Sequence, residues 1–155
     1  MKYGLIGERL SHSFSKEIHE ALADYTYEIR ELSPDEVAPF LEAREFEGIN
    51  VTIPYKEKVI HCLDSVSDAA RKIGAVNTVT KRDGKLYGDN TDFYGMREMI
   101  LGANIDVRGK KVLILGTGGT SKTARAVLSD LGAREIVTVS RRSGEGTVTY
   151  ETALG

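Results

Sequence analysis

Apolar runs of strand length alternate with segments of helical spacing over most of the chain. The predicted strands occupy residues 3–7, 25–32, 49–53, 76–80 and 86–87. The predicted helices occupy residues 16–24, 33–44, 56–63, 67–73 and 92–102. Ser33 followed by Pro34 is typical of a helix start, with the serine as N-cap and the proline in the first turn. The turn Arg82-Asp83-Gly84 predicts a hairpin between the last two strands.

A second unit is predicted from Val107 onward. Its runs at residues 110–115 and 135–140 predict two strands, and residues 120–131 predict a helix between them. Strands that alternate with helices are typical of an α/β protein with a largely parallel sheet. We therefore expect a first domain at residues 1–104, with an open and mostly parallel sheet flanked by helices, and a second, incomplete domain at residues 105–155.

The composition narrows the class of protein without identifying it. Hydrophobic residues make up 41% and charged residues 28% of the 155 residues, which is ordinary for a soluble globular protein. A net charge of -2 gives no reason to expect nucleic acid or an anionic membrane as a partner. The single cysteine, Cys62, excludes an internal disulfide. The few apolar residues before Glu8 are too short for a signal peptide or a membrane span, so we expect a cytoplasmic protein.

A glycine turn joins the first strand and the helix of the second unit. It reads Gly116-Thr117-Gly118-Gly119-Thr120-Ser121, and a glycine turn in this context is typical of a Rossmann dinucleotide-binding domain. Gly116 allows the tight turn, and Gly118 lets the backbone approach a pyrophosphate at the helix N-terminus. Gly119, Thr120 and Ser121 complete the candidate cofactor site, although the last position is serine rather than glycine. The alternative is a turn that needs glycine for steric reasons only.

The end of the next strand favours NADP over NAD. An NAD site usually has an acidic residue there, which binds the ribose 2′-hydroxyl. This strand ends instead in Ser140-Arg141-Arg142. A carboxylate would repel a 2′-phosphate, whereas a guanidinium can bind it with two hydrogen bonds. A hydrogen bond to a charged group contributes about 1.5–3 kcal/mol, although a solvated basic loop would have the same sequence.

Polar residues gather at or just after the ends of the predicted strands of the first domain. They are Ser11, Ser13, Ser15, Thr52, Lys56, Asn77, Asp89, Asn90, Thr91 and Asp92. In an open parallel sheet, ligands bind outside the carboxyl ends of the strands. Hydroxyls, an amide, a lysine and an aspartate suit a small polyhydroxylated ligand that also carries charge. The alternative is that these residues are helix caps and turn residues.

Four segments of the chain resemble signatures of the shikimate dehydrogenase family. They are Ser11-His12-Ser13-Phe14-Ser15, Asn50-Val51-Thr52-Ile53-Pro54-Tyr55-Lys56, Gly74-Ala75-Val76-Asn77-Thr78 and Gly88-Asp89-Asn90-Thr91-Asp92. The glycine turn follows at about the expected distance. The resemblance implies an enzyme that reduces 3-dehydroshikimate to shikimate with NADPH, in the pathway to aromatic amino acids. It implies no metal and leaves a homodimer open.

The resemblance also implies a role for each candidate residue. Ser13 and Ser15 would hold the substrate carboxylate, and Thr52, Asn77 and Asp92 would hold its ring oxygens. Lys56 and Asp92 would form the catalytic pair. The chemistry agrees with this division, because hydride delivered to a ketone leaves an alkoxide that needs a proton donor. A lysine ammonium can donate that proton, and a nearby carboxylate favours its charged form.

Two departures from the family pattern leave the reading open. Lys16 stands where the family usually has proline and Glu20 where it usually has asparagine, so a charge is added near the expected carboxylate site. The chain also supplies only the first strands of a dinucleotide domain, which suggests a truncated form whose own catalysis is doubtful. The remaining alternatives are a quinate or dual quinate/shikimate dehydrogenase, a non-catalytic shikimate-binding fragment, and a structural fragment without a ligand.

Overall fold

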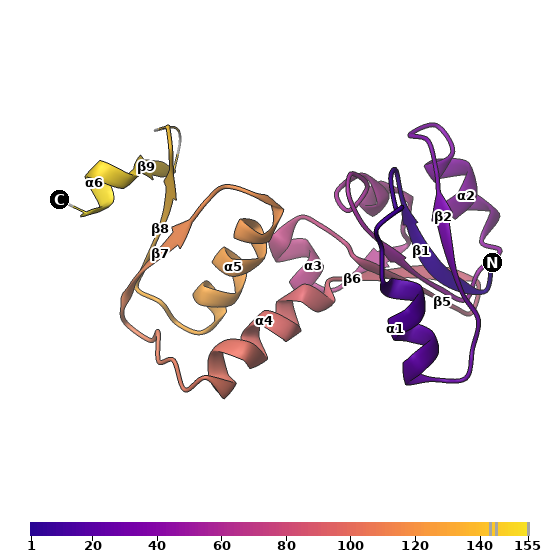
Figure 1. Ribbon diagram of the computed structural model, residues 1–155, viewed down its shortest axis with the longest axis horizontal. Helices are drawn as coiled ribbons and strands as arrows, with labels where there is room; N and C mark the ends of the chain where they lie inside the picture. The colour runs from indigo at the N-terminus through magenta and orange to yellow at the C-terminus, as the bar shows by residue number, and fades with distance from the viewer. Residues whose placement is uncertain (143, 145, 155) are drawn as a thin grey trace. The chain divides into compact units, whose positions relative to one another are not determined.

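The strands pair into two separate sheets, one in each of two units of the chain (Figure 1). The computed structural model describes residues 1–142, 144 and 146–154, and its two units are Met1–Asn90 and Thr91–Gly155. The division falls before the expected boundary near residue 105. Helix α4 (Thr91–Gly102) belongs to the second unit because it packs on α5 (Gly119–Asp130), where Arg97 Nε lies 3.6 Å from a carboxylate oxygen of Asp130.

The first unit is built on one six-stranded sheet in the order β2-β1-β3-β5-β6-β4. Its elements are β1 (Tyr3–Gly7), α1 (Ser15–Leu22), β2 (Tyr27–Glu31), α2 (Val37–Ala43), β3 (Gly48–Val51), the 3-10 helix η1 (Lys58–Cys62), β4 (Ser65–Val66), α3 (Asp68–Ile73), β5 (Thr78–Arg82) and β6 (Lys85–Asp89). The β1–β2, β1–β3 and β4–β6 pairings are parallel, and β5 is antiparallel to both of its neighbours. The expected open, mostly parallel sheet with helices is confirmed, and the antiparallel pairs are the predicted hairpin and its junction with β3.

Alternation along the strands separates two apolar clusters in this unit. Ile6 and Val51 are paired in register and belong to the larger cluster, which also includes Leu41 of α2. Leu5 has the opposite parity and packs in a second cluster with Tyr27. Successive side chains of a strand point to opposite faces of a sheet, so the strands need apolar residues on both faces. This explains why β1 reads as a continuous apolar run.

Some predicted elements differ from the structure. Helix α2 begins at Val37, not near Ser33. Both the backbone N–H and the hydroxyl of Ser33 donate to Glu36 Oε2 at 2.8 Å, which closes a separate turn before the helix. Residues 56–63 form only the short 3-10 helix η1, and the two-residue strand β4 was not predicted. A strand of two residues leaves no readable alternation.

The second unit contains α4, β7 (Lys111–Leu115), α5, β8 (Glu135–Ser140), β9 (Thr147–Thr149) and α6 (Tyr150–Leu154). Its three strands are all parallel, in the order β7-β8-β9. The predicted βαβ unit is confirmed as β7-α5-β8, and its buried core contains Val107, Ile114 and Leu128. Strand β9 and helix α6 were not predicted, because both are short and carry little apolar periodicity.

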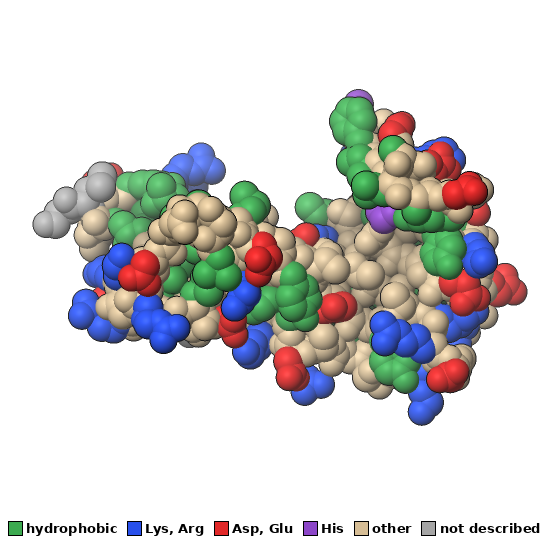
Figure 2. Space-filling model, turned by 90° about the horizontal axis from the view of Figure 1, so that it is seen from below, with side chains coloured by type: hydrophobic (Ala, Val, Ile, Leu, Met, Phe, Trp, Pro, Cys, Tyr) green, Lys and Arg blue, Asp and Glu red, His purple; other side chains and the backbone are tan. Residues whose placement is uncertain are grey.

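The distribution of charge and the apolarity of the helices bear on nucleic-acid and membrane partners. Acidic and basic side chains are interspersed over the face shown in Figure 2, in keeping with the small net charge. Within residues 1–142, 144 and 146–154, no helix has the length and apolarity needed to cross a membrane.

Candidate functional site

Several candidate residues meet at one edge of the six-stranded sheet. Strands β1 and β3 end at this edge and the antiparallel β5 begins there, so Gly7, Thr52 and Asn77 are neighbours. Backbone hydrogen bonds connect these strand ends. Thr52 N–H donates to the Ile6 carbonyl at 3.0 Å, and Val51 N–H donates to the Asn77 carbonyl at 2.8 Å. The carboxyl ends of β1 and β3 therefore form the expected kind of ligand-binding edge.

Lys56 is tied to the same edge through its backbone. Its carbonyl accepts a hydrogen bond of 2.7 Å from the Val76 N–H, directly before Asn77. Asn77 is buried and Lys56 is half-buried. The two motifs that carry these residues are therefore adjacent in the fold, although they are separated in sequence by helix α3.

A pocket of about 530 Å³ lies beside the loop between β1 and α1. It is lined by Leu5, Arg9, Leu10, Ser11, His12, Ser13, Ser15 and Thr52. Three predicted substrate residues, Ser13, Ser15 and Thr52, thus line one pocket. Lys56 and Asn77 lie at the same sheet edge but are not among its lining residues.

The two serines of the pocket are held in a fixed relation to each other. Ser13 Oγ donates to Ser15 Oγ at 3.1 Å and accepts from the Ser15 N–H at 3.3 Å. Ser15 is the first residue of α1, and its N-cap residue Phe14 makes no side-chain capping bond. The amide groups of a helix start carry partial positive charge. Hydroxyls and amides together suit an anionic group.

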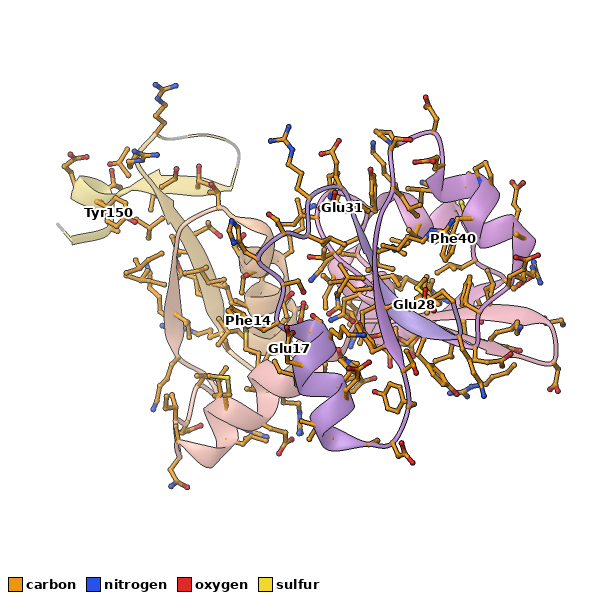
Figure 3. All side chains as sticks on the ribbon, turned by 45° about the vertical axis from the view of Figure 1, so that its right-hand side comes forward. Phe14, Glu17, Glu28, Glu31, Phe40 and Tyr150 are labelled. Carbon is orange, nitrogen blue, oxygen red and sulfur yellow. The ribbon has the colours of Figure 1, made fainter. Side chains whose placement is uncertain are left out.

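The pocket loop is fixed by β2. Leu10 N–H donates to Glu31 Oε1 at 2.7 Å, and Ser13 N–H donates to the Leu10 carbonyl at 3.0 Å. Figure 3 shows Phe14 at the start of α1 and Glu31 at the end of β2. Because Glu31 ends β2 at the sheet edge, its carboxylate can reach the loop that follows β1. The loop between β1 and α1 is therefore anchored to the sheet.

The side chain of Lys16 forms a hydrogen bond with the backbone of β2. Its Nζ donates to Glu20 Oε1 at 3.0 Å and to the Tyr27 carbonyl at 3.1 Å, while Tyr27 N–H donates to Glu20 Oε1 at 2.9 Å. The Tyr27 N–H, and then Lys16, lower the pKa of the Glu20 carboxyl below its ordinary value. The two residues that depart from the family motif, Lys16 and Glu20, thus form one pair that attaches α1 to β2, and the Lys16 charge is matched by Glu20.

A hydrogen-bond network leads from β2 to Asn77. The buried Tyr27 donates its hydroxyl to Asn50 Oδ1 at 2.6 Å, and burial raises the pKa of this phenol, so the donor stays protonated. Asn50 Nδ2 donates to Thr78 Oγ1 at 3.3 Å, and Thr78 Oγ1 donates to Asn77 Oδ1 at 3.0 Å. The Asn77 amide is therefore oriented by residues of three strands. Sequence reasoning assigned no role to Tyr27.

Asp92 lies in the other unit from Lys56. It is exposed in the first turn of α4, directly after the division at Asn90. The predicted pairing of Lys56 with Asp92 therefore stays a prediction. Asn90 is buried, donates from Nδ2 to the Ala75 carbonyl at 2.9 Å, and its Oδ1 has no hydrogen-bond partner among the described residues.

The glycine turn of the second unit leaves space for a ligand. Gly116 has φ 111°, which favours glycine, and its N–H donates to the Val139 carbonyl at 2.8 Å. A Cβ placed on Gly116, Gly118 or Gly119 would meet no described atom within 4 Å. Ser121 Oγ donates to the Gly118 carbonyl at 2.6 Å and closes the turn, so the serine that replaces the third glycine is accommodated.

The predicted phosphate-binding residues lie beside this turn. Ser140 ends β8, which is paired in parallel with β7, and Arg141 and Arg142 follow it as exposed residues. Ser140, the last residue of β8, and Gly116, the residue after β7, thus lie at the ends of adjacent strands. An open turn, a helix start and two exposed guanidinium groups fit a dinucleotide with a 2′-phosphate.

Most of the first unit is similar to a known domain family. Residues 5–79 match the family described as the shikimate dehydrogenase substrate binding domain. The shikimate dehydrogenase (NADP(+)) of Clostridium beijerinckii is 42% identical over 148 residues, which cover 90% of this chain and 55% of that protein. The chain therefore spans about half the length of this curated relative.

Solved structures of shikimate dehydrogenases have the same fold. Shikimate dehydrogenase 1 from Peptoclostridium difficile aligns with a TM-score of 0.80 at 39% identity, covering 96% of this chain and 58% of that one. The shikimate 5-dehydrogenase of Thermus thermophilus, solved in complex with NADP(H) and shikimate, aligns with a TM-score of 0.79 at 33% identity, covering 91% of this chain and 56% of that one. Both alignments extend over the two units.

Proposed function

We propose that this chain carries the substrate domain and the first part of the cofactor domain of an NADP-dependent shikimate dehydrogenase. Such an enzyme reduces 3-dehydroshikimate reversibly to shikimate in aromatic amino-acid biosynthesis, and we expect it in the cytoplasm. The observation that carries the proposal is the pocket where Ser13, Ser15 and Thr52 meet, in a chain whose relatives bear this name. Further support comes from the relative that was solved with both ligands.

In this proposal the substrate carboxylate binds at the start of α1. Ser13 and Ser15 contribute hydroxyls, and the first amides of the helix add partial positive charge. Thr52, Asn77 and Asp92 bind the ring oxygens. Asn77 suits this task because the network through Thr78 fixes its amide before the ligand arrives. A preorganised polar group loses less entropy when the ligand binds.

Lys56 is the proposed proton donor for the alkoxide that forms when the ketone is reduced. Its backbone is fixed beside Asn77, so the ammonium is carried at the edge where the ring oxygens bind. Asp92 would favour the charged form of the lysine. Acid–base assistance of this kind accelerates a reaction about 10²–10⁴-fold.

When bound, the reduced cofactor, NADPH, would supply the hydride and leave as NADP+. Gly116, Gly118, Gly119, Thr120 and Ser121 would hold its pyrophosphate at the start of α5. The 2′-phosphate would lie against Ser140, Arg141 and Arg142. The guanidinium groups of the two arginines can each form two hydrogen bonds with it.

The test is an NMR titration of the 155-residue chain with shikimate. The proposal predicts backbone amide shifts centred on Ser13, Ser15, Thr52 and Asn77. A Ser13→Ala/Ser15→Ala double variant should lose most of this response, whereas the control Ser65→Ala, at an exposed position of strand β4, should keep it. Silence of the wild-type chain at tens of millimolar shikimate would refute the proposed substrate, and an equal response to quinate would favour a dual specificity.

A further inference from the structure

Arg9 is a cation of the pocket that Ser13, Ser15 and Thr52 line. Arg9 follows β1 directly after Glu8 and lines the pocket with Ser13 and Ser15. It is exposed, and among the residues that the structure describes its guanidinium makes no ion pair or hydrogen bond. His12 also lines the pocket. Arginine is the stronger candidate for an anion partner, because it is always charged and offers a fork of donors that matches a carboxylate.

Three other charged residues near the pocket, Lys16, Glu20 and Glu31, are already engaged. Lys16 and Glu20 form an ion pair of 3.0 Å that is also bonded to the backbone of Tyr27. The Glu31 carboxylate accepts the Leu10 N–H and forms no ion pair with Arg9. Arg9 is thus the guanidinium of this loop that is available to an incoming ligand.

A carboxylate in this pocket needs more than the two serines. Hydroxyl groups are neutral, and the Ser13 hydroxyl already donates to Ser15. A carboxylate that leaves water loses strong hydration, which neutral donors only partly replace. A charge-assisted pair with a guanidinium is about twice as strong as a neutral hydrogen bond and fixes the orientation of the carboxylate.

We propose that Arg9 provides the positive charge that pairs with the substrate carboxylate, and that it thereby selects anionic ligands over neutral analogues. This inference rests on the proposed function, because it names the partner of the carboxylate in the same pocket. It assigns Arg9 to substrate specificity, apart from the proton transfer assigned to Lys56.

The experiment compares shikimate with its methyl ester, which has the same ring and no charge. Affinities are measured by NMR titration for the wild-type chain, Arg9→Ala, Arg9→Lys and the control Arg71→Ala. Arg71 is an exposed arginine of α3, and its guanidinium lies 3.7 Å from an Asp68 carboxylate oxygen. Its replacement by alanine changes the net charge by the same amount as Arg9→Ala. Arg9→Ala should weaken shikimate binding about tenfold, Arg9→Lys should restore part of it, and Arg71→Ala should match the wild type. The ester should bind the wild type and Arg9→Ala equally weakly.

Acetate serves as a second probe that separates the two proposals. It carries the carboxylate alone, and it should shift the Nε–H signal of Arg9 in the wild-type chain. If shikimate binds the wild type and Arg9→Ala alike, the Arg9 assignment fails and the proposed function stands. If acetate shifts Arg9 but shikimate binds no better than acetate, the anion site stands and the proposed substrate fails. If neither ligand shifts Arg9 or the serines, both proposals fail.

Discussion

Removal of one hydroxyl, in Tyr27→Phe, tests whether the network behind Asn77 matters for the ligand. Tyr27 is 2% exposed, and its hydroxyl lies 2.6 Å from Asn50 Oδ1. Phenylalanine keeps the packing and leaves the asparagine oxygen without this donor. An unsatisfied buried polar group costs about 1–3 kcal/mol. Since Asn50 is half-buried, we expect a loss in the lower part of this range, about 1–2 kcal/mol.

The chain offers a matched control for this substitution. Tyr55 is fully buried and also donates its hydroxyl at 2.6 Å, to the Leu32 carbonyl. Tyr55→Phe should therefore lower the free energy of unfolding by a similar amount, measured by urea denaturation followed by circular dichroism. Only Tyr27→Phe should also weaken shikimate binding, by about threefold to tenfold, because only its hydroxyl is linked to Asn77 through Asn50. Equal shikimate affinities in the two variants would refute the positioning argument.

Three further predictions address the proton donor, the cofactor and the α1 attachment. Lys56→Ala should keep shikimate affinity within about tenfold and abolish most turnover in a chain with a complete cofactor domain; near-normal turnover would contradict the role of Lys56. Arg141→Ala should weaken the binding of adenosine 2′,5′-bisphosphate, and not of 5′-AMP, by up to about a hundredfold; equal effects on both nucleotides would place the 2′-phosphate elsewhere. Glu20 has a folded-state pKa below its ordinary 4.5, so its stabilising contribution is present above that value and is lost as pH falls through the lowered pKa. The melting temperature of the wild type should exceed that of Glu20→Gln at pH 7, and the difference should shrink as the pH falls below 4.5. A constant difference would show that the charge of Glu20 is not its source.

The sequence was sufficient for the elements that have strong periodicity. The β-branched run of β8 and the glycine turn before α5 predicted the βαβ unit, because each element is long enough to show its period. The predicted start of α2 was wrong. Ser33 has the residue type of an N-cap, but it donates to Glu36 in a separate turn before the helix. Strands β4 and β9 have two and three residues, and no period can be read from so few positions.

The sequence could predict which strand ends form the candidate site, but it could not predict the hydrogen bonds between their side chains. Ser13 and Thr52 could be placed together because β1 and β3 are neighbours whose carboxyl ends face the same edge. The bond from Tyr27 to Asn50 depends on two registers, that of β1 with β2 and that of β1 with β3. A shift of one residue in either register would turn a partner to the opposite face. The residue types alone do not determine such a register.

The same limit explains why Arg9 was overlooked and Lys16 was considered. Both cations stand within a few residues of Ser13 and Ser15, so their distance along the chain does not separate them. Helical geometry places Glu20 one turn after Lys16 on the same face of α1, where opposite charges pair. Arg9 lies in the loop and forms no ion pair with the residues that the structure describes, and the Glu31 carboxylate that anchors the loop is bonded to the backbone of Leu10. A cation that its own fold leaves unmatched is the one available to a ligand, and this property can be read only from the folded chain.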